Sequence, residues 1–143
     1  ITLLKSAKFP DCSADMGSHE FTYSLLPHDG TAVRGETVKQ ANLLNMPPLV
    51  LSGKSAAENK KLFTVNSENV IIDAVKQADN GSGIILRLHE CRGGKARVNI
   101  SLDYDVSSFT PCNLLEEPIG EEFIGKGICA DFNPFEIKSF IIK

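Results

Sequence analysis

The chain has 143 residues, which is the size of one domain and enough to bury a single core without staples. Its composition, 42% hydrophobic and 23% charged, is typical of a soluble globular protein and argues against a disordered or membrane protein. No apolar run approaches the roughly 20 residues needed to cross a bilayer. The net charge of −3, with basic residues scattered along the chain, argues against a surface for nucleic acid or anionic membranes.

The N-terminal quarter is predicted to hold two strands joined by an acidic loop. Residues 1–5 are the first strand and residues 19–26 the second, because Phe21, Tyr23 and Leu25 alternate with polar residues at the period of a pleated sheet. The chain begins with neither an initiator methionine nor a signal-peptide pattern. We therefore expect it to be a piece of a longer protein, with any targeting segment upstream.

One short helix is predicted between residues 35 and 45, where apolar residues recur at helical spacing. The following Pro47-Pro48 pair prevents the helix from continuing. A short strand is expected at residues 49–51 and a polar loop at residues 52–61. The helix-spaced residues are Val38, Ala41 and Leu44.

From residue 62 onward the pattern is repetitive β. The turns at residues 79–83 and 92–95 contain the glycines that tight hairpin connections require. Short strands at this spacing predict an all-β fold, an antiparallel β-sandwich with one short helix, and we expect residues 1–143 to form a single domain. The expected strands are 62–65, 70–77, 84–91, 96–102, 108–115, 122–128 and 136–142.

Several long motifs follow one another along nearly the whole chain, among them Ala-Asp-Met-Gly-Ser-His-Glu-Phe-Thr-Tyr-Ser-Leu-Leu-Pro-His at residues 14–28. Others occupy residues 3–11, 38–47, 67–90 and 134–140. In this order they resemble the C-terminal β-domain of glycoside hydrolase family 38, the zinc-dependent α-mannosidases. One departure is His89, where the family pattern has tyrosine.

The resemblance implies that the full-length protein is a retaining α-mannosidase that hydrolyses terminal α-mannosides in oligosaccharides, with one zinc ion. In the family the nucleophile and the zinc ligands precede this domain, so we expect no catalytic residue and no metal ligand here. The expected partners are the protein's own N-terminal catalytic domain, whose active-site rim this domain supports, and a mannose-containing oligosaccharide. Assembly into a homo-oligomer is left open as well. The location that the resemblance implies is the cytoplasm.

Asp11 and Asp15 are the candidate substrate-binding residues, because they form the only carboxylate pair on a loop beside a predicted strand. The alternative is that they cap backbone amides, as loop aspartates most often do. The pairs Glu116-Glu117 and Glu121-Glu122 are interpreted as solvated turn charges.

The three histidines are too dispersed to predict a zinc site, and hydrogen-bonded turn or core positions are expected for them. Cys12, Cys91, Cys112 and Cys129 show no metal or redox spacing, so free thiols are favoured over disulfides.

Arg87 and Glu90, three apart in one strand, should face opposite sides of the sheet. A salt bridge to an adjacent strand is the default expectation for either residue, although either could line a cleft.

A second function remains open, a mannose-type carbohydrate-binding module without catalysis. Such a module needs exposed aromatic rings to stack on sugars. The chain has no tryptophan and only two tyrosines, which weakens this alternative.

Overall fold

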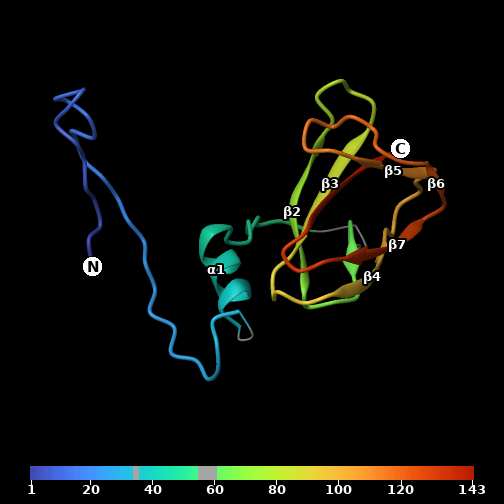
Figure 1. The fold of residues 1–143 in the computed structure, drawn as a ribbon, viewed down its shortest axis with the longest axis horizontal. Coiled ribbons are helices and arrows are strands. Elements are labelled where there is room, and N and C mark those ends of the chain that lie inside the picture. Colours follow the sequence, from blue (N-terminus) through green and yellow to red (C-terminus); the bar gives the residue numbers. More distant parts are fainter. Residues whose placement is uncertain (34–35, 55–60) are drawn as a thin grey trace.

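The computed structural model describes residues 1–33, 36–54 and 61–143, and its strands form an antiparallel β-sandwich (Figure 1). One sheet has three strands in the order β1-β4-β7, and the other has five in the order β2-β3-β8-β5-β6. The elements are α1 (Thr37–Asn45), β1 (Thr64–Val65), β2 (Val70–Gln77), β3 (Ile84–Glu90), β4 (Ala96–Ser101), β5 (Ser108–Cys112), β6 (Phe123–Ile124), β7 (Gly127–Phe132) and β8 (Ile137–Ile142). The predicted fold class is confirmed.

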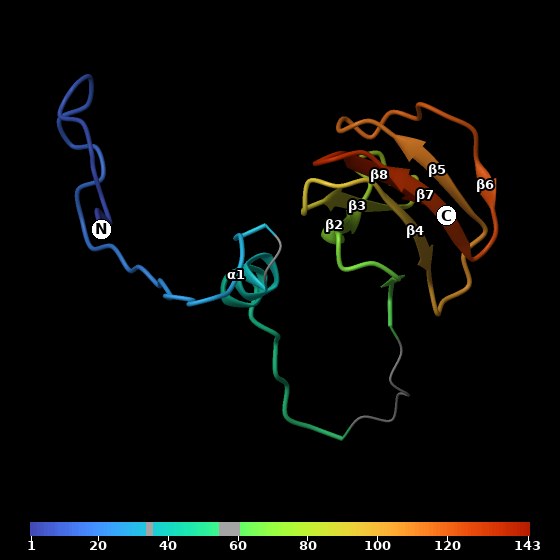
Figure 2. The same cartoon turned by 60° about the horizontal axis from the view of Figure 1, so that its bottom comes forward.

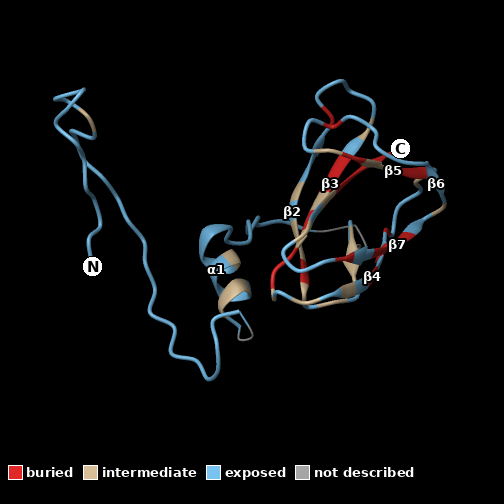
Figure 3. Ribbon diagram, in the orientation of Figure 1, coloured by how far each residue is buried: buried red, intermediate tan, exposed pale blue. Residues whose placement is uncertain are grey.

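The core lies between the two sheets and follows from the period of two along each strand (Figure 3). In β4 and β7 buried and exposed residues alternate, so one face of the three-stranded sheet is covered. The inner faces meet through large side chains that are almost fully buried, including Leu86, Leu88, Val98, Phe109 and Phe132.

The outer face of the five-stranded sheet is partly covered as well. Ile85 of β3 and Ile141 of β8 form a second small cluster with Ala78 and Cys112. Ala78 and Cys112 stand at the ends of β2 and β5, where the chain turns into loops. The central strands therefore read as nearly continuous apolar runs.

All seven predicted strand regions after residue 62 contain a strand, with two informative differences. β5 ends at Cys112 instead of residue 115, because the Asn113 side chain accepts a hydrogen bond from the Leu115 amide and the chain turns there. The predicted strand 122–128 is divided into two short strands. Gly125, with φ of 140°, separates β6, which pairs with β5, from β7, which pairs with β4.

The predicted strands at residues 1–5, 19–26 and 49–51 are absent from the structure. Residues 1–33 form an almost wholly exposed segment ahead of α1 that loops back on itself, with a turn at residues 12–15 (Figures 1 and 2). A strand needs a neighbour to satisfy its backbone, and no described residue pairs with this segment as a strand. That residues 1–143 form one domain stays a prediction, since the sheets use residues 64–142.

The predicted helix is confirmed as α1, which ends before the proline pair. Its expected first residue, Gly35, and residues 55–60 of the expected polar loop lie outside the described residues. None of its residues is fully buried. No helix among the described residues is long and apolar enough to span a bilayer.

Candidate functional site

Asp11, the first predicted substrate contact, is occupied by its own loop. Its Oδ1 atom accepts hydrogen bonds from the backbone amide of Ser13 at 2.9 Å and from the Ser13 hydroxyl at 2.7 Å. These two bonds, the amide first, lower the pKa of the carboxyl. Asp11 therefore has the capping geometry that was the alternative to sugar contact.

Asp15, the second predicted contact, has an exposed side chain and a left-handed backbone with φ of 56°. Its carbonyl oxygen accepts a hydrogen bond from Nε2 of His19 at 2.7 Å. Neither aspartate lines the clefts described next. A role of the pair in binding substrate stays a prediction.

Two adjoining clefts lie between α1 and strand β2. The larger has a volume of about 530 Å³ and is mainly apolar, with Leu43 of the helix and Ile72 of β2 among its lining residues. The smaller, about 360 Å³, contains a polar pair at its wall. There the ring Nδ1 of His89 lies 2.8 and 2.7 Å from the two carboxylate oxygens of Asp73.

Cys91 lines both clefts, but it is not an activated nucleophile. Burial raises the pKa of its thiol, and the negative charge of Glu90 raises it further. The thiol is therefore held in its neutral, weakly reactive form at neutral pH. The clefts offer apolar surface and one His–Asp pair, without an assembled nucleophile and base.

Glu90, at the end of β3, is a fully buried carboxylate that anchors two loops. Its Oε2 atom accepts hydrogen bonds from the backbone amides of Gly93 at 2.8 Å and Phe135 at 2.9 Å. Its Oε1 atom accepts one from the amide of Arg92 at 2.9 Å. The residue thus joins the β3–β4 turn to the β7–β8 loop. Sequence reasoning missed this role, although a glutamate two residues before the Arg92-Gly93-Gly94 turn was the available signal.

The pKa of Glu90 reflects two opposing effects. Burial alone raises the pKa of the carboxyl, because it disfavours the charged form. Hydrogen bonds to the charged form outweigh that effect, so the pKa is lowered. The donors are the backbone amides of Phe135, Arg92, Gly94 and Gly93.

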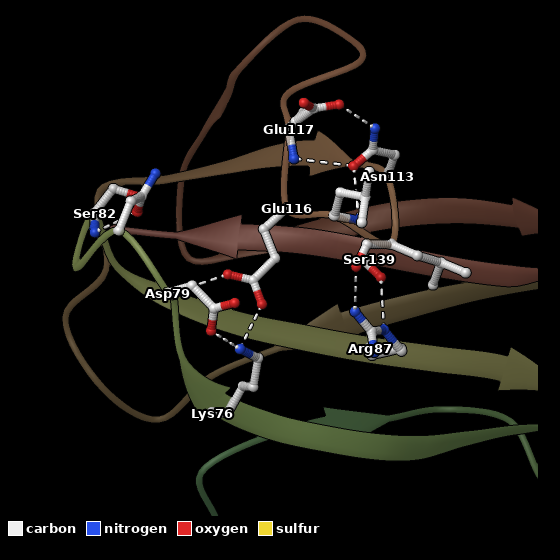
Figure 4. A network of polar contacts seen from close by, with 11 residues as sticks. Lys76, Asp79, Ser82, Arg87, Asn113, Glu116, Glu117 and Ser139 are labelled. Atoms are coloured by element: carbon white, nitrogen blue, oxygen red, sulfur yellow. Dashed lines mark hydrogen bonds and ion pairs between the residues drawn. The ribbon is translucent and has the colours of Figure 1, made fainter.

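Arg87 lies on the opposite face of β3 from Glu90, as predicted. It reaches the adjacent strand β8 through the Ser139 hydroxyl, with Nε to Oγ at 3.1 Å, and not through a carboxylate (Figure 4). A second bond runs from its terminal nitrogen to the carbonyl of Leu114 at 3.3 Å. Arg87 is thus a positioning residue for the loop after β5.

The prediction that all four turn glutamates are solvated is wrong for Glu116, which is buried, and agrees with the exposure of Glu117, Glu121 and Glu122. The Glu116 carboxylate accepts the amide of Asp79 at 2.7 Å and pairs with the Lys76 ammonium at 2.5 Å (Figure 4). The Lys76 bond and then the Asp79 amide lower the pKa of Glu116. Sequence spacing could not show that residues 37 positions apart share this contact.

The remaining candidates have structural roles. His28 lies 3.3 Å from the carbonyl of Asp29 through Nδ1, and His19 also contacts a backbone carbonyl, as predicted for hydrogen-bonded loop positions. His89 differs from the prediction, because it lies half-buried in strand β3 and pairs with Asp73. All four cysteines are free thiols, as favoured from the sequence. Within the described ranges, no group of three His, Cys, Asp or Glu side chains could hold a metal ion.

Comparison with known proteins assigns this arrangement to a family. Residues 69–140 match the glycosyl hydrolases family 38 C-terminal beta sandwich domain. The chain is 34% identical to Alpha-mannosidase G of Dictyostelium discoideum over 98% of its length, and 33% identical to Alpha-mannosidase 2C1 of Homo sapiens over 99%. It is 27% identical to Alpha-mannosidase of Saccharomyces cerevisiae over 98% of its length.

The chain spans 14% of the length of the Dictyostelium and human relatives and 15% of the yeast relative. The matched residues 69–140 contain all strands from β2 to β8 except residues 141 and 142 at the end of β8. The chain therefore belongs to glycosyl hydrolase family 38 and forms the C-terminal β-sandwich domain of that family.

Proposed function

We propose that this chain is the C-terminal accessory domain of a zinc-dependent, retaining α-mannosidase that hydrolyses terminal α-mannosides in oligosaccharides. Its task is to support the catalytic domain and the rim of the active site. The relatives named α-mannosidase align with nearly all of this chain but extend far beyond it. This difference in length favours an accessory role for the domain within a longer polypeptide.

One observation carries this proposal, the exposure of the alternating segment at residues 19–26. Leu25 is 91% exposed, and Phe21 and Tyr23 are exposed as well. An apolar alternation of this kind is typical of a strand with one buried face. Within the described residues the His19 ring stacks on Phe21, and no strand pairs with the segment. The proposal therefore assigns the cover of Tyr23 and Leu25 to another part of the polypeptide.

Zinc, on this proposal, belongs to the catalytic domain. The described residues do not fit a zinc site, because no three potential ligands lie together. The nucleophile is assigned to the same catalytic domain. The residues of this chain then support the catalytic domain and the rim of the active site, and take no part in the reaction. Asp11 and Asp15 remain the proposed contacts to a mannose-containing oligosaccharide, through the oxygens that local hydrogen bonds leave available.

We also propose a cytoplasmic location. Four free thiols, two of them buried, support a reducing compartment. We further propose self-association into a homo-oligomer, which the exposed apolar surface of the domain supports.

The test is hydrolysis of a chromogenic α-mannoside, with added zinc, by this chain and by the uninterrupted natural polypeptide side by side. Activity in the long polypeptide alone is the expected result. Absence of hydrolysis in both would contradict the proposed substrate while leaving the family intact, and activity in this chain alone would contradict the accessory role.

A carbohydrate-binding module is the second candidate, favoured by one observation. Phe9 and Tyr23 are well exposed in the N-terminal segment, where rings could stack on sugars. Titration of mannose or mannobiose followed by amide chemical shifts separates the two functions. Shifts confined to residues around these rings would favour the binding module, whereas an unchanged spectrum favours the accessory domain.

A further inference from the structure

The loop between β5 and β6 exposes apolar side chains on a backbone that is held from several sides. We call residues 113–118 the leucine loop. Leu114 is 59% exposed and Leu115 is 79% exposed. Single exposed leucines are ordinary, so the question is what holds this pair in place.

The backbone of the leucine loop is fixed chiefly by Asn113. The Asn113 Oδ1 atom accepts the amides of Leu115 at 2.9 Å and Glu117 at 3.0 Å, and its Nδ2 donates to the Glu117 carboxylate at 2.8 Å. Backbone bonds close the loop, from the Asn113 amide to the Glu117 carbonyl at 2.9 Å and from the Glu116 amide to the Asn113 carbonyl at 3.1 Å. The loop is therefore ordered before any partner arrives.

Neighbouring elements add contacts from beneath the leucine loop (Figure 4). Arg87 of β3 donates to the carbonyl of Leu114 at 3.3 Å. Lys76 of β2 and the Asp79 amide of the following turn bind the buried Glu116 carboxylate. Three separate parts of the five-stranded sheet thus converge on a loop of six residues.

Glu116 also adopts a left-handed backbone, with φ of 66°. A residue with a side chain is strained in this region and stays there only when its surroundings determine it. Such strain is concentrated at ligand clamps and functional loops. Here it places a buried carboxylate below the loop while the two preceding leucines face water.

We infer that the leucine loop docks into an apolar pocket on the catalytic part of the same polypeptide. The inference rests on the proposed function, and it names the element of the sandwich that makes the contact. A rigid loop loses little conformational freedom on docking, so its contact contributes more to association. Because Glu117 lies exposed in the same loop, two residues after Leu115, the receiving pocket has a basic rim.

The catalytic part is chosen as occupant because of the length of polypeptide involved. In the aligned relatives about 85% of the polypeptide lies outside the region that matches this chain. Residues 69–140 of this chain match the family's C-terminal domain as one continuous stretch. That length offers a large surface to which the loop is permanently close. Tethering in one polypeptide makes the contact intramolecular, which favours it over a second copy.

The test is photo-crosslinking in the uninterrupted polypeptide, with Leu115→p-benzoylphenylalanine. Irradiation of dilute protein followed by digestion and mass spectrometry is expected to give a crosslinked peptide from outside these 143 residues, within one polypeptide. The matched control is Ile124→p-benzoylphenylalanine, which is as exposed as Leu115 but lies opposite Ser108 at the far end of β5. It is expected to give no such peptide.

Three outcomes would overturn the inference. They are the absence of a crosslink beyond residues 1–143, crosslinks only between two copies or to another protein, and equal crosslinking from the control position. Hydrolysis of the α-mannoside by the unmodified polypeptide is scored separately. Hydrolysis without the crosslink overturns the docking alone, while the crosslink without hydrolysis contradicts the proposed function alone.

A second variant tests the leucines themselves. Leu114→Ser combined with Leu115→Ser is expected to increase hydrogen exchange in the peptide that the crosslink identifies, while the amides of β3 and β8 stay protected. Protected β3 and β8 show that the sandwich is folded. Unchanged exchange in the identified peptide would also overturn the inference.

Discussion

The exposed segment at residues 1–33 and the sandwich at residues 64–142 contain similar sequence patterns but differ in the reach of their contacts. Among the described residues, side-chain hydrogen bonds of this segment join residues at most four apart, as from His19 to Asp15. In the sandwich, Arg87 reaches Ser139 and Glu90 reaches Phe135, 52 and 45 positions away. Apolar alternation therefore becomes a strand only where the chain supplies a neighbouring strand to pair with.

The largest expected effect comes from truncating one phenylalanine in each region. Phe109 is fully buried and Phe9 is 87% exposed. Phe109→Ala should lower the free energy of unfolding by about 3–5 kcal/mol, because it removes buried apolar surface and leaves a cavity. Phe9→Ala should change it by less than about 0.5 kcal/mol. Urea denaturation of both variants makes the measurement, and equal losses would contradict the comparison.

The second prediction compares one carboxylate from each region. Glu90→Ala should destabilise the fold by about 3 kcal/mol, since it leaves several buried amides without an acceptor. Asp11→Ala removes only a local, exposed cap, so its urea unfolding curve should overlay that of the parent chain. A Glu90→Ala curve that also overlays the parent would show that water replaces the lost carboxylate.

The third prediction concerns the turn that Glu90 holds. Gly93 has φ of 72°, and an added Cβ would lie 2.8 Å from the Phe135 ring. Gly93→Ala should therefore cost about 1–3 kcal/mol, from backbone strain together with the clash. Adding Phe135→Ala should recover the part due to the clash. If the double variant is no more stable than the single one, the strain in the backbone accounts for the whole loss.

The smallest expected effect is a dependence of stability on pH. The pKa values of Glu90 and Glu136 are lowered on folding, for Glu136 chiefly by the amide of Asn133. A lowered pKa contributes stability that is present above the ordinary value of 4.5 and is lost as the pH falls through the folded-state pKa. The urea midpoint should fall below that pH, and Glu136→Gln should flatten the fall. A midpoint that rises on acidification would contradict the assignment.

Most of the sandwich was predictable, because strand alternation and glycine turns are local signals. The hairpin at residues 79–83 was predicted correctly, whereas the division of the predicted strand at Gly125 was not. In the first case the turn residues stand between two clear alternations, and β2 and β3 pair as neighbours. In the second, residues 122–128 were predicted as one strand although Gly125 and Lys126 interrupt the apolar residues. The switch from one sheet to the other depends on the partners of β6 and β7.

The candidate site was less predictable. Asp11 and Asp15 were chosen for their position on an acidic loop, and their local bonds follow the short-range chemistry that the sequence contains. Glu90 and Glu116 were not recognised as anchors, because their donors come from distant parts of the chain. For Glu116 the sequence gives no sign of burial until the fold places the Asp79 amide and the Lys76 ammonium group around it.

By itself, the sequence determined the fold class, the short helix at residues 37–45, the turns and the family. These depend on local periodicity, on proline and glycine, and on motifs in a given order. Only the tertiary structure decided which alternations become strands, which glutamates carry buried charge and which leucines stay in water. Each of those outcomes depends on partners far away along the chain, and pairing energies between distant residues leave no period in the sequence.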